Sequence, residues 1–586
     1  MKHYIALVSE ITKGQIFEKT IDKQSLIFVK YGEEIKAYSS LCPHQGANLA
    51  DGHIENDAIV CPMHQRKYAC KNGYDIINHN VLSKYEVVVE HEQVYVILHD
   101  ENKTSSQQQY RTIKDLPQPK GSFLLGNLAQ LKANNKPRII EDWVKECGEI
   151  FKVSLLGKKI IISADPEFNI QLYKNRPEGF RRYGKIDEIM SEMGIKGVFN
   201  AEGEQWKIHR KFTAEALNNK NVQGFFHTLH QVTQRLHKRW SEKSKAGSFV
   251  VDIQKELMLY TTDITTQVAF GYDAQCLIHS EDVLQEHLEK IFPMINKRTI
   301  SPFPVWRFFK SKEDKDIDKS LQALKKIMSE FIQKAKERLK TLPELKDKPE
   351  NFLQALLVEQ EKTGNFSDEE IFGNVFTLLL AGEDTTSNTI SWTLYYLLQN
   401  PEAYKKIKAE IDSVLKDDTF LNNPDSLLAL MYTEAVAMES MRICPVTPIL
   451  FLESLQEQVV KDVLLKKGDR IMLQSRIAQN KDMHFSNASS FVPERWLPET
   501  KCPVHQTDVF RTFGAGPRFC PGKTLAVHEM KMALAMIIHN FDLSMAVNHK
   551  DVNQQFAFTL FPENLMLEIK PKALKVESHL QNYFAE

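Results

Sequence analysis

Several features that would assign a protein to a class at once are missing from this chain. Its 586 residues include only 8 cysteines, too few for a disulfide framework at this size. The 75 Lys and Arg nearly balance the 76 Asp and Glu, so the charge offers no bulk attraction to nucleic acid or to an anionic membrane. No run of about 18 uncharged apolar residues is found, so we expect no transmembrane segment.

Targeting and nucleotide-binding motifs are also scarce. The apolar run after Met1 is too short for a secretory signal, and together with the few cysteines this predicts a soluble protein of the cytoplasm. Phosphate-binding loops, hydrolase nucleophile elbows and a nicotinamide or flavin domain are not evident. What remains is an ordinary globular composition, 42% apolar and 26% charged, in a chain long enough for several domains.

The first part of the chain, residues 1–104, is predicted to form β-strands. Residues 26–31 and 35–38 flank a Gly-Glu-Glu turn, and residues 85–89 and 94–98 flank a second turn. Both pairs are typical of β-hairpins. This segment is therefore expected to be a small all-β domain.

Two pairs of Cys and His lie between the predicted hairpins. Cys42-Pro-His44 is followed, after sixteen residues, by Cys61-Pro-Met-His64. A tetrahedral zinc site uses the same ligand types, but about two to four residues usually separate a zinc-binding pair. The spacing resembles that of a Rieske [2Fe-2S] domain, with zinc as the alternative. The resemblance implies that Cys42 and Cys61 bind one iron of the cluster and that His44 and His64 bind the other.

Two neighbouring positions indicate which kind of Rieske domain this is. Ala47 and Met63 stand where the respiratory kind carries two cysteines that bridge its cluster loops. That disulfide cannot form here. The resemblance therefore implies the soluble, ferredoxin kind, whose cluster has a lower potential and passes single electrons.

A change in composition then marks the junction between two domains. Residues 105–116 are predicted to be a linker, because a polar stretch without apolar period leads into a segment rich in proline. A flexible linker of about a dozen residues holds two sites at roughly millimolar effective concentration. Residues 117–575 are expected to form the second domain, and residues 576–586 a C-terminal tail.

Ten residues near the C-terminus carry the most specific motif in the chain. The stretch from Phe513 to Gly522 reads F-x-x-G-x-R-x-C-x-G, with Arg518 and Cys520 in place. Five fixed identities at these spacings arise by chance in such a chain about twice in ten thousand. The stretch resembles the haem-binding loop of the cytochrome P450 family. The resemblance implies that Cys520 is the axial thiolate on the iron of haem b, within a loop formed by Phe513 and Arg518, and that Arg518 meets a propionate.

Two upstream segments extend this resemblance. Trp206 and Arg210 stand one helical turn apart in a W-x-x-x-R pattern, where the family binds a haem propionate. Ser367 and Glu370 form a capping box before an apolar period of about thirty residues, which predicts a helix about 45 Å long. In its middle lies Ala-Gly-Glu-Asp-Thr-Thr, and its glycine and threonines predict a local widening of the helix. The resemblance assigns Asp384 and Thr385 as the acid and alcohol that deliver protons while O2 is cleaved.

The remaining family features are structural or apolar. Glu439 and Arg442 form E-x-x-R and, with Arg495, resemble the family's buried charge network around the cysteine loop. The family commonly has an arginine four residues after Pro448, yet this chain has Leu452, so either the register slips or a propionate contact is missing. Residues 446–451 and 556–560 fall where the family lines its substrate pocket, and both are apolar, which predicts a lipophilic small-molecule substrate.

The whole chain therefore resembles a fusion of a small all-β Rieske domain and a mainly α, α+β cytochrome P450 domain. The predicted activity is a monooxygenase that inserts one oxygen atom from O2, with electrons relayed through the cluster from an external NAD(P)H-dependent ferredoxin reductase. A peroxide-driven or isomerising haem enzyme is one alternative, and a redox sensor in which the cluster gates the haem is another. A Rieske dioxygenase is disfavoured, because no mononuclear iron site stands out after residue 105.

Overall fold

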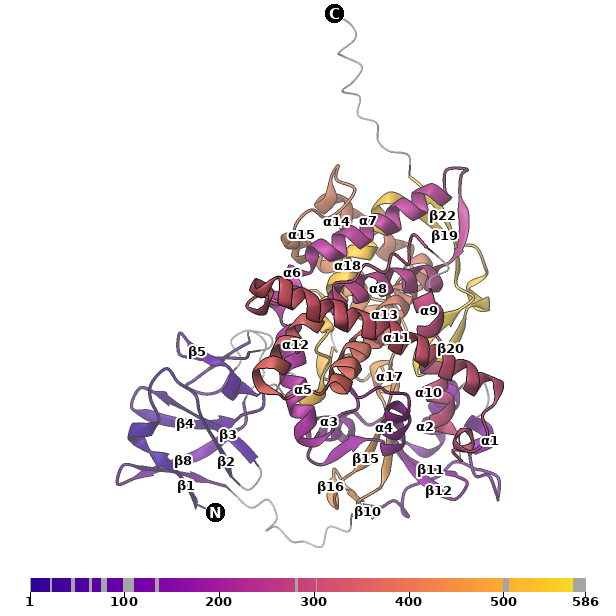
Figure 1. The fold of residues 1–586 in the computed structure, drawn as a ribbon. Helices are drawn as coiled ribbons and strands as arrows, with labels where there is room; N and C mark the ends of the chain where they lie inside the picture. Colours follow the sequence, from indigo (N-terminus) through magenta and orange to yellow (C-terminus); the bar gives the residue numbers. More distant parts are fainter. Residues whose placement is uncertain are drawn as a thin grey trace, which may run out of the picture.

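A computed structural model of the chain describes residues 2–21, 24–43, 48–62, 66–74, 82–98, 110–131, 136–279, 283–301, 303–498 and 505–572. Figure 1 shows a small domain of strands at the N-terminus and a larger, mainly helical domain that follows it. This arrangement confirms the predicted fold class. None of the helices in these ranges is both long and apolar enough to cross a bilayer.

The N-terminal domain contains a six-stranded antiparallel sheet in the order β1-β9-β8-β4-β3-β2 and a three-stranded sheet in the order β5-β6-β7. The strands of the first sheet are β1 (Lys2–Leu7), β2 (Phe17–Ile21), β3 (Gln24–Tyr31), β4 (Glu34–Ser39), β8 (Lys84–Glu90) and β9 (Gln93–Ile97). Those of the second are β5 (His53–Glu55), β6 (Ala58–Val60) and β7 (Lys67–Ala69). Both predicted hairpins are confirmed, as β3-β4 and β8-β9.

Strand β3 separates two apolar cores of the N-terminal domain. Leu26 and Phe28 pack into one cluster, and the alternate residues Ile27 and Val29 pack into another that also contains Cys42 and Cys61. Successive side chains of a strand point to opposite faces, so a strand buried on both faces reads as a continuous apolar run. Cys42 and Cys61, the candidate cluster ligands among the described residues, therefore lie on one face of the sheet.

The second domain is built around long helices that pack on one another. The helix α13 (Asp368–Gln399) lies against α8 (Ile253–Phe270), α16 (Met431–Ile443) and α18 (Lys523–Asn540), with α14 (Pro401–Leu415) beyond them. The helices before these are α1 (Leu128–Leu131), α2 (Lys136–Cys147), α3 (Pro166–Lys174), α4 (Gly184–Glu192), α5 (Gly203–Ala216), α6 (Asn219–Gly224) and α7 (Phe226–Lys243). The others are α9 (Val283–Leu288), α10 (Ile291–Ile300), α11 (Lys312–Thr341), α12 (Phe352–Thr363), α15 (Pro424–Ala429) and α17 (Ser475–Gln479).

The long helix predicted from the capping box is confirmed. The Ser367 side chain accepts from the Glu370 backbone N–H, and the Glu370 carboxylate accepts from the Ser367 backbone, so two N-terminal donors are satisfied. The helix has 32 residues and ends at Gln399, directly before Asn400 and Pro401. The expected widening is wrong, because the helix stays α-helical throughout and the Thr385 hydroxyl instead donates to the Ala381 carbonyl at 2.6 Å.

Small sheets complete the second domain. The largest has the order β11-β12-β18-β15-β13, formed by β11 (Ile150–Leu155), β12 (Lys158–Ser163), β18 (Arg470–Gln474), β15 (Ile449–Ser454) and β13 (Phe180–Arg182). The others comprise β10 (Arg111–Thr112), β16 (Gln458–Val460) and β17 (Val463–Leu465), then β14 (Phe249–Asp252), β19 (Phe541–Met545) and β22 (Met566–Pro571), and the hairpin β20 (Asn553–Ala557) and β21 (Thr559–Glu563). These strands bring segments from the start and the end of the domain together.

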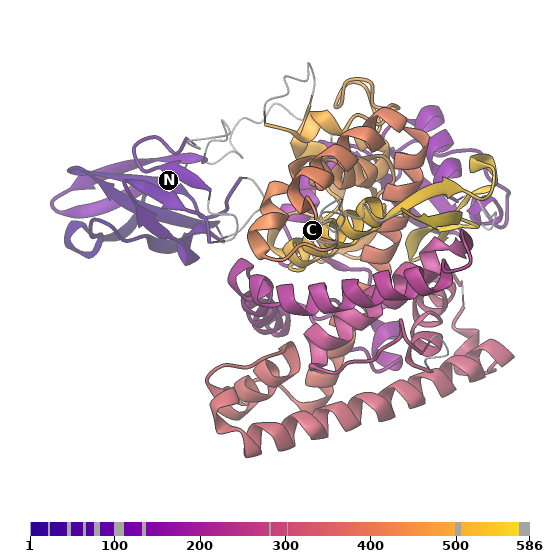
Figure 2. The same cartoon turned by 90° about the horizontal axis from the view of Figure 1, so that it is seen from above.

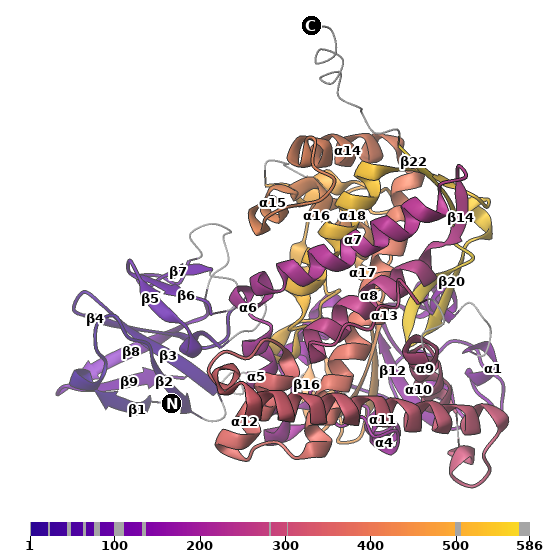
Figure 3. The same cartoon turned by 45° about the horizontal axis from the view of Figure 1, so that its top comes forward.

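The second half of the predicted linker is already attached to the second domain. Strand β10 pairs in parallel with β17, and Arg111 makes a bidentate contact with Asp462 at 2.6 and 3.0 Å. Leu116 is buried in the apolar cluster beside that sheet. Figures 2 and 3 show that the N-terminal domain lies to one side, and Figure 3 shows it next to the end of the second domain that carries α5 and α6.

Candidate functional site

The predicted cysteine loop is a tight turn directly before α18. Gly514 and Gly516 have φ values of 74° and 67°, and a Cβ on Gly516 would lie 2.2 Å from the Tyr173 carbonyl oxygen, so only glycine fits there. The Cys520 backbone N–H donates to the Phe513 carbonyl at 2.8 Å, which closes the loop. Burial raises the pKa of the Cys520 thiol, and the Gly522 backbone N–H, Arg210 and Lys523 oppose that rise. These three groups favour a thiolate, the form that binds a metal.

Phe513 and Trp206 support the same loop from two sides. The Phe513 ring packs against the main core of the domain, with the Lys523 ammonium 5.8 Å from its centre. Trp206 lies on α5 under Arg518, whose guanidinium is 4.6 Å from the indole ring centre. Arg210, one turn along α5, lies 4.6 Å from the centre of the Phe519 ring. The structure therefore brings together the five residues predicted to hold haem, Trp206, Arg210, Phe513, Arg518 and Cys520.

Several arginines around this loop have unsatisfied buried nitrogens. Within the described residues, Arg176 has no partner for Nε and Nη2, Arg210 has none for Nη2, and Arg518 has none for Nε. Arg518 contacts the Glu202 carboxylate and donates to the Ala201 carbonyl at 2.7 Å. A buried unpaired cation is costly, so this site calls for further carboxylates. The two propionates of haem would supply these carboxylates, so the residues present fit the group.

The acid and alcohol of α13 point to different partners. The Asp384 carboxylate accepts from Asn388 Nδ2 at 3.0 Å and from the hydroxyl of Thr559 on β21. Burial raises the pKa of Asp384 to about 6, and these two hydrogen bonds limit the rise. Thr385 donates its hydroxyl to its own helix, as described above. An acid that titrates near neutral pH can both take up and release protons, as general acid-base chemistry requires.

Two buried carboxyl groups at the motif of α13 were not predicted as functional residues. Burial raises the pKa of Glu383 to about 8, and a hydrogen bond from Gln285 Nε2 at 2.9 Å opposes the rise. Burial likewise raises the pKa of Glu529, on α18, to about 8, and Thr386 opposes the rise. Glu383 is part of the motif that named Asp384 and could have been found from it. Glu529 has no such local signal, because only packing of α18 on α13 brings it close.

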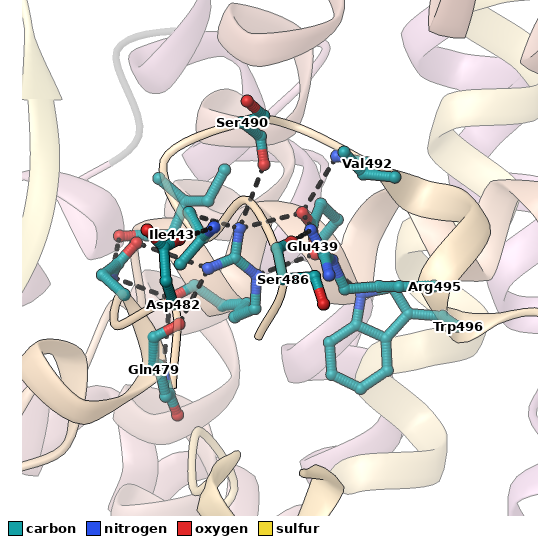
Figure 4. Close-up of polar contacts among 12 residues, drawn as sticks. Glu439, Ile443, Gln479, Asp482, Ser486, Ser490, Val492, Arg495 and Trp496 are labelled. Carbon is teal, nitrogen blue, oxygen red and sulfur yellow. Dashed lines mark hydrogen bonds and ion pairs between the residues drawn. The ribbon is translucent and has the colours of Figure 1, made fainter. Parts of the chain in front are cut away.

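The predicted charge network is present and fully buried. Arg442 binds both oxygens of Glu439 at 2.9 Å, and Arg495 Nε donates to the same carboxylate at 3.1 Å. Trp496 Nε1 and the Val492 backbone N–H donate to it as well, each at 2.9 Å (Figure 4). Arg442 also donates to the Ala488 carbonyl, so the segment before the cysteine loop is tied to α16.

Leu452 occupies a regular position in β15, where its side chain is completely buried. It packs in an apolar cluster with Phe180 and Leu172. The strand continues without a break on both sides of it, so no bulge displaces Leu452 from its place in the sheet.

The candidate cluster site is described only in part. Cys42 and Cys61 are both buried in the same apolar cluster, and the Tyr68 hydroxyl lies 3.1 Å from Cys42 Sγ. The Cys61 backbone N–H donates to the Arg66 carbonyl at 2.8 Å, which closes the second cysteine loop. His44 and His64 lie outside the described residues. Two buried thiols on one face of the domain fit the cysteine half of the Rieske ligand set.

A cavity of about 520 Å³ reaches Asp384 from the side of α10. Its apolar lining includes Met258, Leu288, Phe292, Met294 and Phe561, from α8, α9, α10 and β21. The volume lies within the range of sites for small ligands.

Two protein-family descriptions match the chain. Residues 116–569 match "Cytochrome P450", and residues 1–81 match "Rieske [2Fe-2S] domain". Among curated proteins, the chain is 26% identical over 446 residues to the chloroplastic protein LUTEIN DEFICIENT 5 of Arabidopsis thaliana, covering 74% of each chain. It is 26% identical over 447 residues to cytochrome P450 86B1 of the same plant, covering 72% of this chain and 79% of that one.

A further relative combines two activities in one chain. The bifunctional cytochrome P450/NADPH--P450 reductase of Bacillus cereus is 25% identical over 476 residues, which cover 79% of this chain and 43% of that protein. The P450 domain binds haem and uses O2, and the Rieske domain carries a [2Fe-2S] cluster. The chain belongs to the cytochrome P450 family, as a monooxygenase with a Rieske domain at its N-terminus.

Proposed function

We propose that this monooxygenase receives its electrons from an external NAD(P)H-dependent ferredoxin reductase through its own Rieske domain and oxidises a lipophilic small molecule. Cys42, His44, Cys61 and His64 hold the cluster, and Cys520 ligates the haem iron. Haem supplies the oxygen chemistry at this site. The protein itself positions the two centres, holds the substrate and moves protons.

The orientation of the N-terminal domain is the observation that carries the proposal. Asp51, close after the first cysteine loop, is near enough to Lys211 of α5 for the lysine to lower its carboxyl pKa, although burial and Glu18 raise that pKa overall. Burial lowers the pKa of Lys523 at the start of α18, and Arg66, which follows the second cysteine, is near enough to lower it further. Lys523 is three residues from Cys520. Asp51 and Arg66 are therefore on the side of the N-terminal domain next to the haem loop, which supports an electron relay between the two domains.

The supply of protons depends on the groups around Asp384. Its hydrogen bonds to Thr559 and Asn388 hold the carboxylate at the wall of the cavity, where solvent protons have access. We propose that Asp384 takes up these protons and passes them toward Thr385, the next residue on the same helix. The cavity combines apolar side chains, such as Met258 and Phe292, with charged ones that include Lys290. This lining supports a substrate that buries apolar surface and also carries a polar group.

The relay is tested with the complete protein under anaerobic conditions and carbon monoxide. The cluster is reduced rapidly with a photochemical donor, and the loss of its signal and the rise of the ferrous haem-CO spectrum are followed together. We expect both to proceed at one rate that does not depend on protein concentration. A reduced cluster beside a haem that stays ferric, with and without added lipophiles, would instead favour the redox sensor.

A charge reversal at the domain interface provides a second test. Lys211→Glu replaces the attraction to Asp51 by repulsion, and exposed charge contacts are worth about 0.2 to 1 kcal/mol, so the transfer should slow by at least about 1.4-fold at low salt. Lys550→Glu is the matched control, because Lys550 is exposed in the 3-10 turn His549–Asp551, directly before β20, which Figure 1 shows on the side of the second domain away from the N-terminal domain. Equal rates in both variants would contradict the proposed orientation.

A further inference from the structure

The missing arginine at Leu452 has a neighbour that can replace it. In the five-stranded sheet, β13 pairs with β15 in antiparallel register, and Arg182 is directly opposite Leu452. Directly opposed residues of an antiparallel pair point to the same face of the sheet. The side chain of Arg182 therefore leaves the sheet on the side that an arginine at position 452 would use.

Arg182 is held in place by contacts that leave the end of its guanidinium unused. Its backbone N–H donates to Glu202 Oε1 at 2.9 Å, its Nε donates to the Phe199 carbonyl at 3.3 Å, and its guanidinium carbon lies 3.6 Å from the centre of the Phe199 ring. In the part of the chain that the structure describes, its two terminal nitrogens make no hydrogen bond. A planar fork with two such donors fits a carboxylate.

The surroundings of Arg182 contain more positive than negative charge. Arg176, Arg182 and Arg518 repel one another across the site, and Glu202 is the carboxylate that attracts all three. Asp187 adds to the attraction on Arg182, and Glu178, which is exposed, adds to that on Arg518. Burial and the repulsion from Arg518 lower the pKa of Arg182 to about 10. Three arginines around one shared carboxylate are not balanced by the protein alone.

We propose that Arg182 binds a propionate of haem in place of the arginine that Leu452 lacks. The contact is made from the adjacent strand β13 and not from β15, but on the same face of the sheet. Arg176, which is buried with two unsatisfied nitrogens, lies close enough to share the same carboxylate. The absence of an arginine at position 452 therefore does not leave the propionate on this side of the haem without a cation.

An exchange of the two side chains tests the proposal. Haem release from Arg182→Leu is measured by transfer to excess apomyoglobin, which follows cofactor binding and requires no turnover. Hydrogen bonds to charged groups contribute enough that release should become about 10- to 150-fold faster. The double variant Arg182→Leu with Leu452→Arg returns the arginine to β15, and we expect it to restore most of the lost retention.

Controls separate this role from a purely structural one. Arg181→Leu changes the preceding residue of β13, which pairs with Glu453 at 2.9 Å, and should leave haem release unchanged. Arg182→Leu should lower the melting temperature of the haem-bound protein, while the haem-free protein should melt no lower than its parent, because the loss removes an unbalanced cation. Wild-type haem release from Arg182→Leu, equal losses of stability with and without haem, or a folded double variant without recovery would each overturn the proposal.

Discussion

Removal of the Thr559 hydroxyl should raise the pKa of Asp384. Thr559 is almost completely buried and donates to the ionised carboxylate, so Thr559→Val takes away a hydrogen bond that favours the charged form. Such bonds to charged groups are worth about 1.5 to 3 kcal/mol, which corresponds to about one to two pKa units. Starting from a pKa of about 6, the carboxyl should then titrate at about 7 to 8.

The neighbouring charges support this reasoning. Glu383, with a pKa of about 8, is protonated while Asp384 titrates in the parent, but its titration overlaps the range expected for Thr559→Val, so both proteins are compared in a Glu383→Gln background. Asn388 is unchanged in the variant and keeps its own hydrogen bond to Asp384. In that background the change in the pKa of Asp384 reports the loss of the Thr559 hydroxyl.

The assay is infrared spectroscopy of the protonated carboxyl band between pH 4.5 and 9. Asp384→Asn identifies the band by its loss, and Thr559→Ser, which keeps the hydroxyl, should titrate like the parent. A midpoint in Thr559→Val that matches the parent would refute the contact as the cause of the tuned pKa. A midpoint that moves down instead of up would mean that Thr559 stabilises the protonated form of Asp384 and not the ionised form.

Three further predictions address the buried charges and the helix α13. Glu439→Ala leaves Arg442 and Arg495 without their carboxylate, at a cost of about 3 to 5 kcal/mol, and should lower the ratio of haem to protein. Glu494→Ala is the control, because it removes a more exposed ion pair and should leave that ratio unchanged. Thr385→Ala should release more peroxide per electron consumed than the parent. Thr389→Ala is the control, because it loses a similar hydrogen bond to its own helix. Equal peroxide release from the two variants would count against proton delivery by Thr385. Glu529 has a pKa raised from 4.5 to about 8, so its folded form binds more protons and stability falls as pH rises between these values. Glu529→Gln should therefore raise the melting temperature relative to the parent increasingly from pH 4.5 to 8, and a constant difference would contradict the buried carboxyl as its source.

The sequence was most informative where chemistry requires fixed spacing. The glycines around Cys520, the E-x-x-R pair and the capping box at Ser367 act within a few residues, and each was found where the pattern predicted it. The β3-β4 hairpin was predictable for the same reason, because alternation and a turn are local signals.

Contacts between distant segments could not be read in this way. Thr559 is 175 positions from Asp384, and Arg182 lies 270 positions from Leu452, so each pair meets only after the sheets and helices have assembled. The expected widening near Gly382 failed for a related reason. The Thr385 hydroxyl bonds the Ala381 carbonyl without displacing the helix, because it adds to the backbone bond and does not replace it.

The surplus of buried arginines also has a consequence for how much of this enzyme a cell maintains. Until haem arrives, Arg176, Arg182 and Arg518 share too little negative charge, so the empty protein opens more readily than the loaded one. Quality-control proteases degrade chains in proportion to how often they open. The steady amount of this protein should therefore follow the supply of haem, even at a constant rate of synthesis.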